Sequence, residues 1–124
     1  MSSSFHEFVR ELFAGLGQVQ IKRMFGGAGV YADGRMFALL ADETIYIKTD
    51  DTLKAALAEE GSGPFVWTPN KGPRAGESVE MSYWRLPEAA LDDPELASRW
   101  AEKALAVARS KATAKPKARK SRKV

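Results

Sequence analysis

The change of hydrophobic period near residue 19 constrains this chain more than any other feature of its sequence. From residue 19 to residue 48 the pattern has a period of two, interrupted at Gly26-Gly27, Asp33-Gly34 and Asp42-Glu43. A period of two indicates strands, and connections this short make successive strands antiparallel. We expect a tight turn with positive φ at Asp33-Gly34. The predicted strands cover residues 19–25, 28–32, 36–41 and 44–48.

Three other segments have the 3.6-residue period of an amphipathic helix. Residues 4–16 place aromatic and aliphatic side chains three and four positions apart, after serines that suit an N-cap. Residues 50–60 begin at Asp50 or Asp51 and stop before a glycine. Asp93-Pro94 starts a third helix, which we expect to run to about Arg109. Two more strands are predicted over residues 65–68 and 78–85, with an irregular polar loop between them.

The order of these elements indicates the fold class. Four strands follow one another without an intervening helix, which favours an α+β domain with an antiparallel sheet and the order α-β(4)-α-β(2)-α. A chain of 124 residues that is 44% apolar has the size of one domain. We therefore expect a folded domain over residues 1–108. Residues 109–124 have no apolar surface to offset the entropy of ordering, so we expect a disordered basic tail.

Composition excludes several kinds of site. The chain has no cysteine, which rules out disulfides, thiolate catalysis and cysteine-based metal centres. It has one histidine, His6, which we expect on a helix surface and not as a general base. The carboxylates are scattered and have cap or surface explanations, so we predict no catalytic residues, no metal site and no cofactor.

No segment indicates a membrane or an export signal. The longest apolar stretch, residues 36–41, is far shorter than a membrane-spanning helix, and the N-terminus lacks a basic start followed by an apolar run. We expect a cytoplasmic protein without membrane contacts.

The charges are distributed unevenly along the chain. Residues 1–108 hold eleven of the nineteen basic residues and all sixteen acidic ones, a net charge of −5, although the whole chain is +3. The charge of the tail is equally consistent with loose, sequence-nonspecific attachment to DNA or RNA and with a solubilising tail that has no partner. Its basic residues are Arg109, Lys111, Lys115, Lys117, Arg119, Lys120, Arg122 and Lys123.

The glycine-rich segment over residues 23–31 invites comparison with a phosphate-binding loop. Such a loop needs a following helix or a Gly-Lys-Ser/Thr sequence, and here a strand follows. We favour a hairpin or bulge in which Gly26 and Gly27 take positive φ and Gly29 allows close backbone approach. An unspecified binding role is the alternative.

Several blocks, in order, strongly resemble the N-terminal domain of the TfoX/Sxy family, regulators of competence genes. They include the glycine-rich segment, the following strand pair with Asp33-Gly34, and the Leu86-Pro87 and Asp93-Pro94 regions. The resemblance covers about residues 4–108. The motif residues that carry a structural or interaction role by this resemblance are Arg23, Met24, Phe25, Gly26, Gly27, Gly29, Tyr31, Phe37 and Lys48.

The resemblance implies a two-layer sandwich of the same element order and no catalytic residues. It also implies a regulatory or adaptor role, in competence or transcription, through contacts with a protein partner. The regulators that give the family its name carry a further C-terminal helical domain, where this chain has its basic tail. The alternative is a nonspecific nucleic-acid-binding protein that uses the tail, and monomer and homodimer both stay open.

Two sets of residues have competing interpretations. Arg23 and Lys48 are candidates to face an acidic partner or a phosphate, but we favour strand-end charges paired with Asp33, Asp42 or Asp50. A second set is a candidate platform for stacking bases. Its strand positions favour sheet and core packing, and the acidic body opposes a nucleic-acid backbone. This set comprises Tyr31, Tyr46, Trp67, Tyr83 and Trp84.

Overall fold

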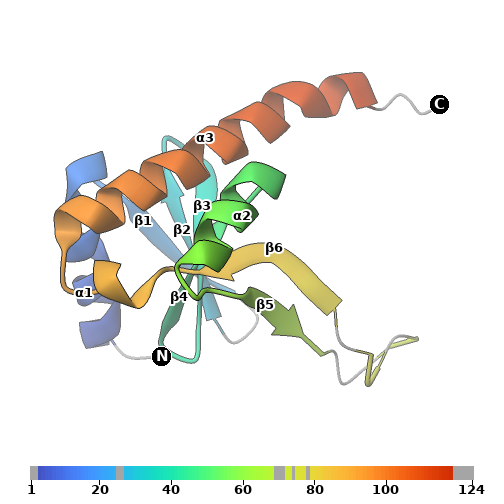
Figure 1. Ribbon diagram of the computed structural model, residues 1–124, viewed down its shortest axis with the longest axis horizontal. Coiled ribbons are helices and arrows are strands. Elements are labelled where there is room, and N and C mark those ends of the chain that lie inside the picture. Colours follow the sequence, from blue (N-terminus) through green and yellow to red (C-terminus); the bar gives the residue numbers. More distant parts are fainter. Residues whose placement is uncertain (1–2, 25–26, 69–71, 74, 78, 119–124) are drawn as a thin grey trace.

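The computed structural model of this chain describes residues 3–24, 27–68, 72–73, 75–77 and 79–118 (Figure 1). Within these residues the chain forms one six-stranded sheet, three α-helices and two 3-10 helices. The helices are α1 (Ser3–Leu12), η1 (Ala14–Leu16), α2 (Asp51–Glu59), η2 (Glu88–Ala90) and α3 (Pro94–Ala118). The strands are β1 (Gln20–Met24), β2 (Gly27–Ala32), β3 (Arg35–Ala41), β4 (Thr44–Lys48), β5 (Pro64–Trp67) and β6 (Val79–Arg85).

The strands lie in the order β1-β2-β3-β4-β6-β5, and every neighbouring pair is antiparallel. α3 packs across β3 and β4, and α1 lies against the first part of α3 (Figure 1). α2 lies beside the middle of α3. The predicted α+β class and element order are confirmed.

The core lies between the sheet and the helices. In β4 the isoleucines Ile45 and Ile47 are buried, whereas the alternate residues are half-buried. Pairing of Ala28 with Leu40, and of Leu40 with Ile45, extends this buried row across three strands. Alternation with a period of two therefore assigns one face of the sheet to the helices.

A β-bulge in β3 brings one aromatic residue into this core. Val30 pairs with Ala38 while Tyr31 pairs with Met36, which leaves Phe37 as the extra residue. The Phe37 ring is buried edge-on against Phe13, with ring centroids 5.4 Å apart. Strict alternation places Phe37 and Ala38 on opposite faces, so the bulge explains why both are fully buried.

The predicted caps at Asp50 and Asp93 and the tight turn at Asp33-Gly34 are confirmed. The Asp50 carboxylate accepts a hydrogen bond from the Leu53 backbone N–H at 2.9 Å, and Asp93 accepts one from Leu96 at 3.2 Å. At the β2–β3 turn, Asp33 has φ 55° and Gly34 has φ 75°. These caps provide acceptors for backbone donors that a helix start leaves without partners.

Two helix ends differ from the prediction. α1 ends at Leu12 and is followed by the separate turn η1, instead of one helix over residues 4–16. α3 continues to Ala118, past the expected end near Arg109. Residues 111–115 include two alanines and two lysines, which are good helix formers, and extending an existing helix avoids the cost of nucleation. Pro116 opposes this extension in the last turn.

Gly27 and Gly29 have roles other than those predicted. Gly27 does not have positive φ, and Gly26 lies outside the described residues. The close backbone approach occurs at Gly27, where a Cβ atom would collide with the main-chain carbonyl oxygen of Leu40. At Gly29 an added Cβ would instead meet the side-chain ends of Met24 and Met36, at 2.9 and 3.0 Å.

This difference predicts unequal costs for two matched substitutions. Gly27→Ala forces β2 and β3 apart, so we expect it to lower the free energy of unfolding by about 1–3 kcal/mol. Gly29→Ala displaces only flexible methionine ends, so its cost should stay below about 1 kcal/mol. Urea denaturation of both variants measures the difference, and equal costs would contradict this account of the motif.

Candidate functional site

A hollow of about 600 Å³ lies on the face of the sheet opposite the helices. Residues that line it come only from strands and the segments next to them, because no described helix packs on this face. We call it the sheet-face groove. Its main side chains are Met24, Met36, Leu39, Phe65, Met81 and Tyr83.

Methionines give the groove much of its lining. Met24 lies on β1, Met36 on β3 and Met81 on β6, so they reach the groove from separate strands. Met24 and Met36 meet above Gly29, where the missing side chain leaves room for both. Methionine is flexible and polarisable, so such a lining can adapt to apolar groups of different shapes.

Tyrosines and lysines share this face with the groove. The Lys22 Nζ atom lies 5.0 Å from the centre of the Tyr31 ring, and Lys48 Nζ lies 4.9 Å from that of Tyr83. Cation–π attraction favours both arrangements. Burial raises the pKa of Tyr83, and nearby Tyr31 raises it further, so its phenol stays protonated at neutral pH. The charge of this cluster therefore comes from the two lysines.

The strands are basic although the folded body is acidic. Five basic residues stand against one acidic residue across β1 to β6, whereas residues 1–108 as a whole have a net charge of −5. The excess negative charge therefore lies on the helices and connecting segments. The charged strand residues are Lys22, Arg23, Arg35, Lys48 and Arg85, with Glu80 as the one acid.

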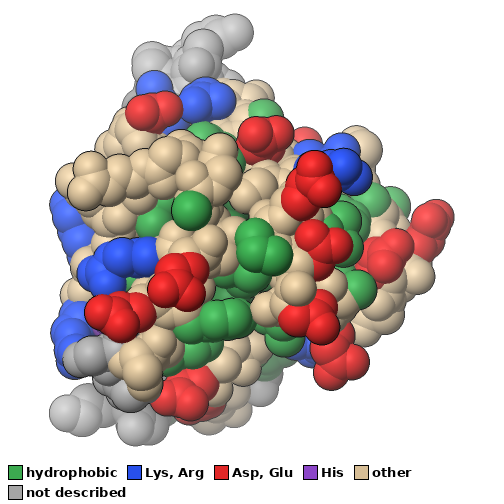
Figure 2. Space-filling model, turned by 90° about the vertical axis from the view of Figure 1, so that its left-hand side faces the viewer, with side chains coloured by type: hydrophobic (Ala, Val, Ile, Leu, Met, Phe, Trp, Pro, Cys, Tyr) green, Lys and Arg blue, Asp and Glu red, His purple; other side chains and the backbone are tan. Residues whose placement is uncertain are grey.

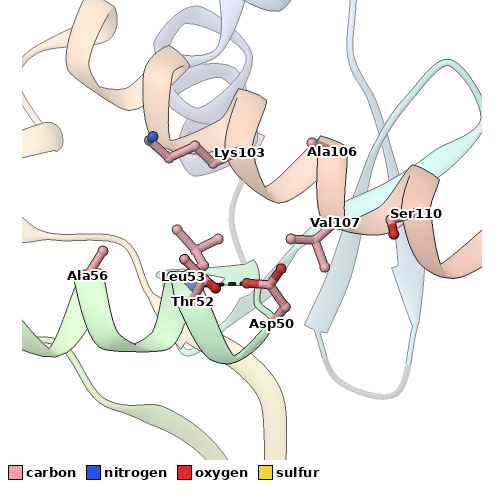
Figure 3. A pocket seen from close by; sticks show the side chains of 8 residues that line it. All are labelled: Asp50, Thr52, Leu53, Ala56, Lys103, Ala106, Val107 and Ser110. Carbon is pink, nitrogen blue, oxygen red and sulfur yellow. Dashed lines mark hydrogen bonds between the residues drawn. The ribbon is translucent and has the colours of Figure 1, made fainter.

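A second hollow, of about 310 Å³, lies between α2 and α3 (Figure 3). Asp50 enters it from the start of α2, and Lys103 and Ser110 from α3. The Asp50 carboxylate is engaged by the Leu53 N–H, shown by the dashed line in Figure 3. Lys103 lies away from Asp50 in this view, so the polar groups of the cleft do not converge on one point.

A third hollow, of about 240 Å³, lies beside α1 and η2. Phe5, Phe8 and Leu91 supply its apolar lining, and Glu43 and Glu88 supply carboxylates. Figure 2 faces the end of the molecule where α1 lies and shows hydrophobic side chains interspersed with acidic ones. This end therefore carries part of the body's negative charge.

The motif residues divide between the two faces of the sheet. Register places Gly29, Tyr31 and Lys48 on the face of the groove, which Met24 and Gly27 also line. Arg23 pairs with Ala28 on the helix side, and Phe37 is buried in the core. Phe25 and Gly26 lie outside the described residues.

The expected ion pairs have other partners where the structure gives them. Asp33 lies 3.0 Å from the Arg109 guanidinium on α3, and Asp50 caps α2. Lys48 has the Tyr83 ring beneath its ammonium group. In the described part of the chain, Asp33 and Asp50 therefore do not form the expected ion pairs with Arg23 and Lys48.

The aromatic residues separate in a way that sequence reasoning missed. Tyr31, Tyr46 and Tyr83 are half-buried on the uncovered face, and Tyr46 contacts Phe65 with ring centroids 4.9 Å apart. Trp84 pairs with Ile47 and packs on the core instead. One sequence signal could have shown this separation. Isoleucine and tyrosine alternate in residues 44–48, so Ile45 and Ile47 lie on one face of the sheet and Tyr46 lies on the other.

The tail residues are placed only in part. Arg109 is part of α3 and is paired with Asp33, and Lys111, Lys115 and Lys117 follow on the same helical backbone. Arg119, Lys120, Arg122 and Lys123 lie outside the described residues. Assignment of these residues to nucleic acid stays a prediction.

His6 is buried, not on the helix surface as predicted, with 7% of its surface exposed. Its Nε2 atom has no hydrogen-bond partner among the described residues. Burial lowers the pKa of His6, and the positive charges of Arg23, Arg10 and the N-terminus lower it further. The folded protein therefore favours the neutral imidazole.

This shift predicts a pH-dependent stability. The unfolded chain, with a histidine pKa of 6.5, binds a proton more readily than the folded chain. The contribution of His6 to the free energy of unfolding is therefore fully present above pH 6.5. It decreases as the pH is lowered from 6.5, by at most about 1.4 kcal/mol per pH unit. Urea denaturation between about pH 5.5 and 7.5 should show this slope. His6→Gln should flatten it, and an unchanged slope would show that another group is responsible.

The described residues show no metal cluster and no membrane span. They contain no group of three or more His, Asp or Glu residues arranged to hold a metal ion. None of their helices combines the length and apolar character that crossing a membrane requires.

Comparison with known proteins places the chain in a family. The model of the TfoX N-terminal domain matches residues 11–108. This range contains all six strands and the part of α3 that packs on them. No significant match was found among curated proteins. The predicted resemblance is confirmed, and the chain belongs to the TfoX N-terminal domain family.

Proposed function

We propose that this chain is a non-enzymatic regulatory adaptor that acts through protein contacts made by the uncovered face of its sheet. The observation that carries the proposal is the sheet-face groove, a largely apolar hollow of about 600 Å³ on a face without helices. Large exposed apolar hollows on a soluble domain are typical of binding surfaces. The family supports a role in competence or transcription regulation.

The lining of the groove supports binding over catalysis. Its aliphatic, aromatic and thioether groups offer apolar contact area. Asp42, at the β3–β4 turn, is the carboxylate among the residues that line it. General acid–base chemistry needs titratable groups that converge on one reacting atom, and contact with a protein needs only area and shape.

Site-specific photocrosslinking tests the assignment. A photoreactive phenylalanine analogue at Leu39, which lines the groove, should crosslink a defined set of proteins in cells that naturally express the chain. The same analogue at Glu102, exposed on α3, is the matched control. We expect the set to be specific to position 39 and to be reduced about tenfold or more when Met36→Asp is added. Identical sets at both positions would overturn the proposal.

A second candidate function is loose binding of nucleic acid through the C-terminal basic residues. α3 carries Lys111, Lys115 and Lys117 on a helix that extends past the sheet (Figure 1). A helix that projects in this way brings basic residues near a phosphate backbone while keeping the acidic body away from it. Contacts of this kind are sequence-nonspecific.

The salt dependence of binding tests this candidate. Fluorescence anisotropy with labelled duplex DNA should show affinity that falls steeply with salt for the full chain. Replacing the three lysines with glutamine should reduce the log–log slope by about 0.9 for each phosphate contact that is lost. Lys54→Gln with Lys103→Gln is the control, with the same kind of charge change on the folded body. Equal slopes in all three proteins would contradict binding through these residues.

A further inference from the structure

We infer that the sheet-face groove binds an acidic amphipathic segment of a partner protein, with apolar side chains in the groove and carboxylates at Lys22 and Lys48. This inference rests on the proposed function and specifies the chemistry of its partner. The charges of this face carry it.

The positive groups stand beside the apolar ones on the same face. Lys22 pairs with Gly29, over which Met24 and Met36 meet, and Lys48 pairs with Tyr83, which lines the groove. A bound apolar segment is therefore within reach of both ammonium groups. Charge complementarity of this kind steers association and selects among partners.

Tyrosine rings hold the two lysines in place. Each ammonium group lies about 5 Å from the centre of a ring, Lys22 over Tyr31 and Lys48 over Tyr83. Because Tyr83 stays protonated at neutral pH, its hydroxyl group adds a hydrogen-bond donor beside Lys48. A partner carboxylate meets positioned cations and a neutral phenol, with no tyrosinate to oppose it.

The groove also has a direction. Asp42 lies in the turn before β4 and lines the groove, and Lys48 is the last residue of β4, so a negative group and a positive group lie at opposite ends of this strand. A partner segment that is acidic throughout would meet Asp42. The favoured ligand therefore has its carboxylates concentrated at the end that lies near Lys48 and Lys22.

Nucleic acid fits the same face less well. The Tyr31 and Tyr83 rings, on which bases would stack, already have lysines over them. Met36 and Leu39 offer no hydrogen-bond donors to base edges, and Asp42 at the lining of the groove opposes a continuous phosphate backbone. An acidic peptide brings far less negative charge than an oligonucleotide of similar length.

Selection from a random display library of 12-residue peptides on the immobilised full chain tests the inference. We expect enriched peptides to combine apolar residues with Asp or Glu toward one end. On Lys22→Glu with Lys48→Glu, enrichment should change to Lys and Arg. On Lys54→Glu with Lys103→Glu, the matched helical control, the acidic preference should persist.

Affinities of one selected acidic peptide make the test quantitative. Reversal of Lys22 and Lys48 should weaken its binding about tenfold or more, while the helical control changes it by less than about twofold. A peptide with lysines in place of its acids should recover binding to the reversed variant. Lys22 is exposed and Lys48 is half-buried, so reversing their charges leaves the core unchanged. Circular dichroism checks that each variant is folded.

Other outcomes separate the inference from the proposed function. Apolar peptides enriched without acids overturn the acidic partner but keep the groove as a protein-binding surface. If the selected peptides bind the folded variants Leu39→Asp and Met81→Glu with the same affinity as the original chain, the groove is not the binding surface. That result would overturn the proposed function itself. If labelled dT12 binds more tightly than any peptide, the partner is nucleic acid instead of an acidic segment. If sedimentation shows a dimer that Leu39→Asp dissociates, the groove binds a second copy of the chain.

Discussion

The packing of α3 on the sheet is the interaction on which the rest of the structure depends. Alanines occupy the most deeply buried positions of α3, and Ala97, Ala101 and Ala104 have no exposed surface. Short side chains let the helix approach β3 and β4 closely, while Leu40 and Ile47 fill the remaining space from the sheet side. Larger residues along this row would push the helix away from the sheet and open the core.

One layer of helices has a direct consequence for the other face of the sheet. With its helices on one side, a six-stranded sheet leaves its second face to solvent unless a partner covers it. Such a face in antiparallel sheets is commonly polar, but here methionines, a leucine and aromatic residues occupy it. The departure from simple alternation of apolar and polar residues is what distinguishes this face from an ordinary solvated one.

The sequence predicted the element order, the caps at Asp50 and Asp93 and the turn at Asp33-Gly34, because each depends on local spacing and side-chain chemistry. It did not predict the bulge at Phe37, which depends on the Phe13 ring that packs on it. Burial of His6 was missed for the same reason, since helical spacing alone does not show what packs on α1. Alternation also separates Tyr46 from Ile45 and Ile47 without showing which face the helices cover. These features are properties of tertiary packing.

Charge on this domain has to be considered face by face. A net charge of −5 for residues 1–108 would argue against an acidic partner only if the charge were spread evenly over the domain. Register instead places Lys22 and Lys48 together on the uncovered face of the sheet. At physiological ionic strength, screening limits exposed charges to a range of about 8 Å. A ligand in the groove therefore experiences mainly Lys22, Lys48 and Asp42, not the carboxylates on distant helices. For this reason an acidic protein can present a basic surface, and the sign of the local charge decides which partner fits.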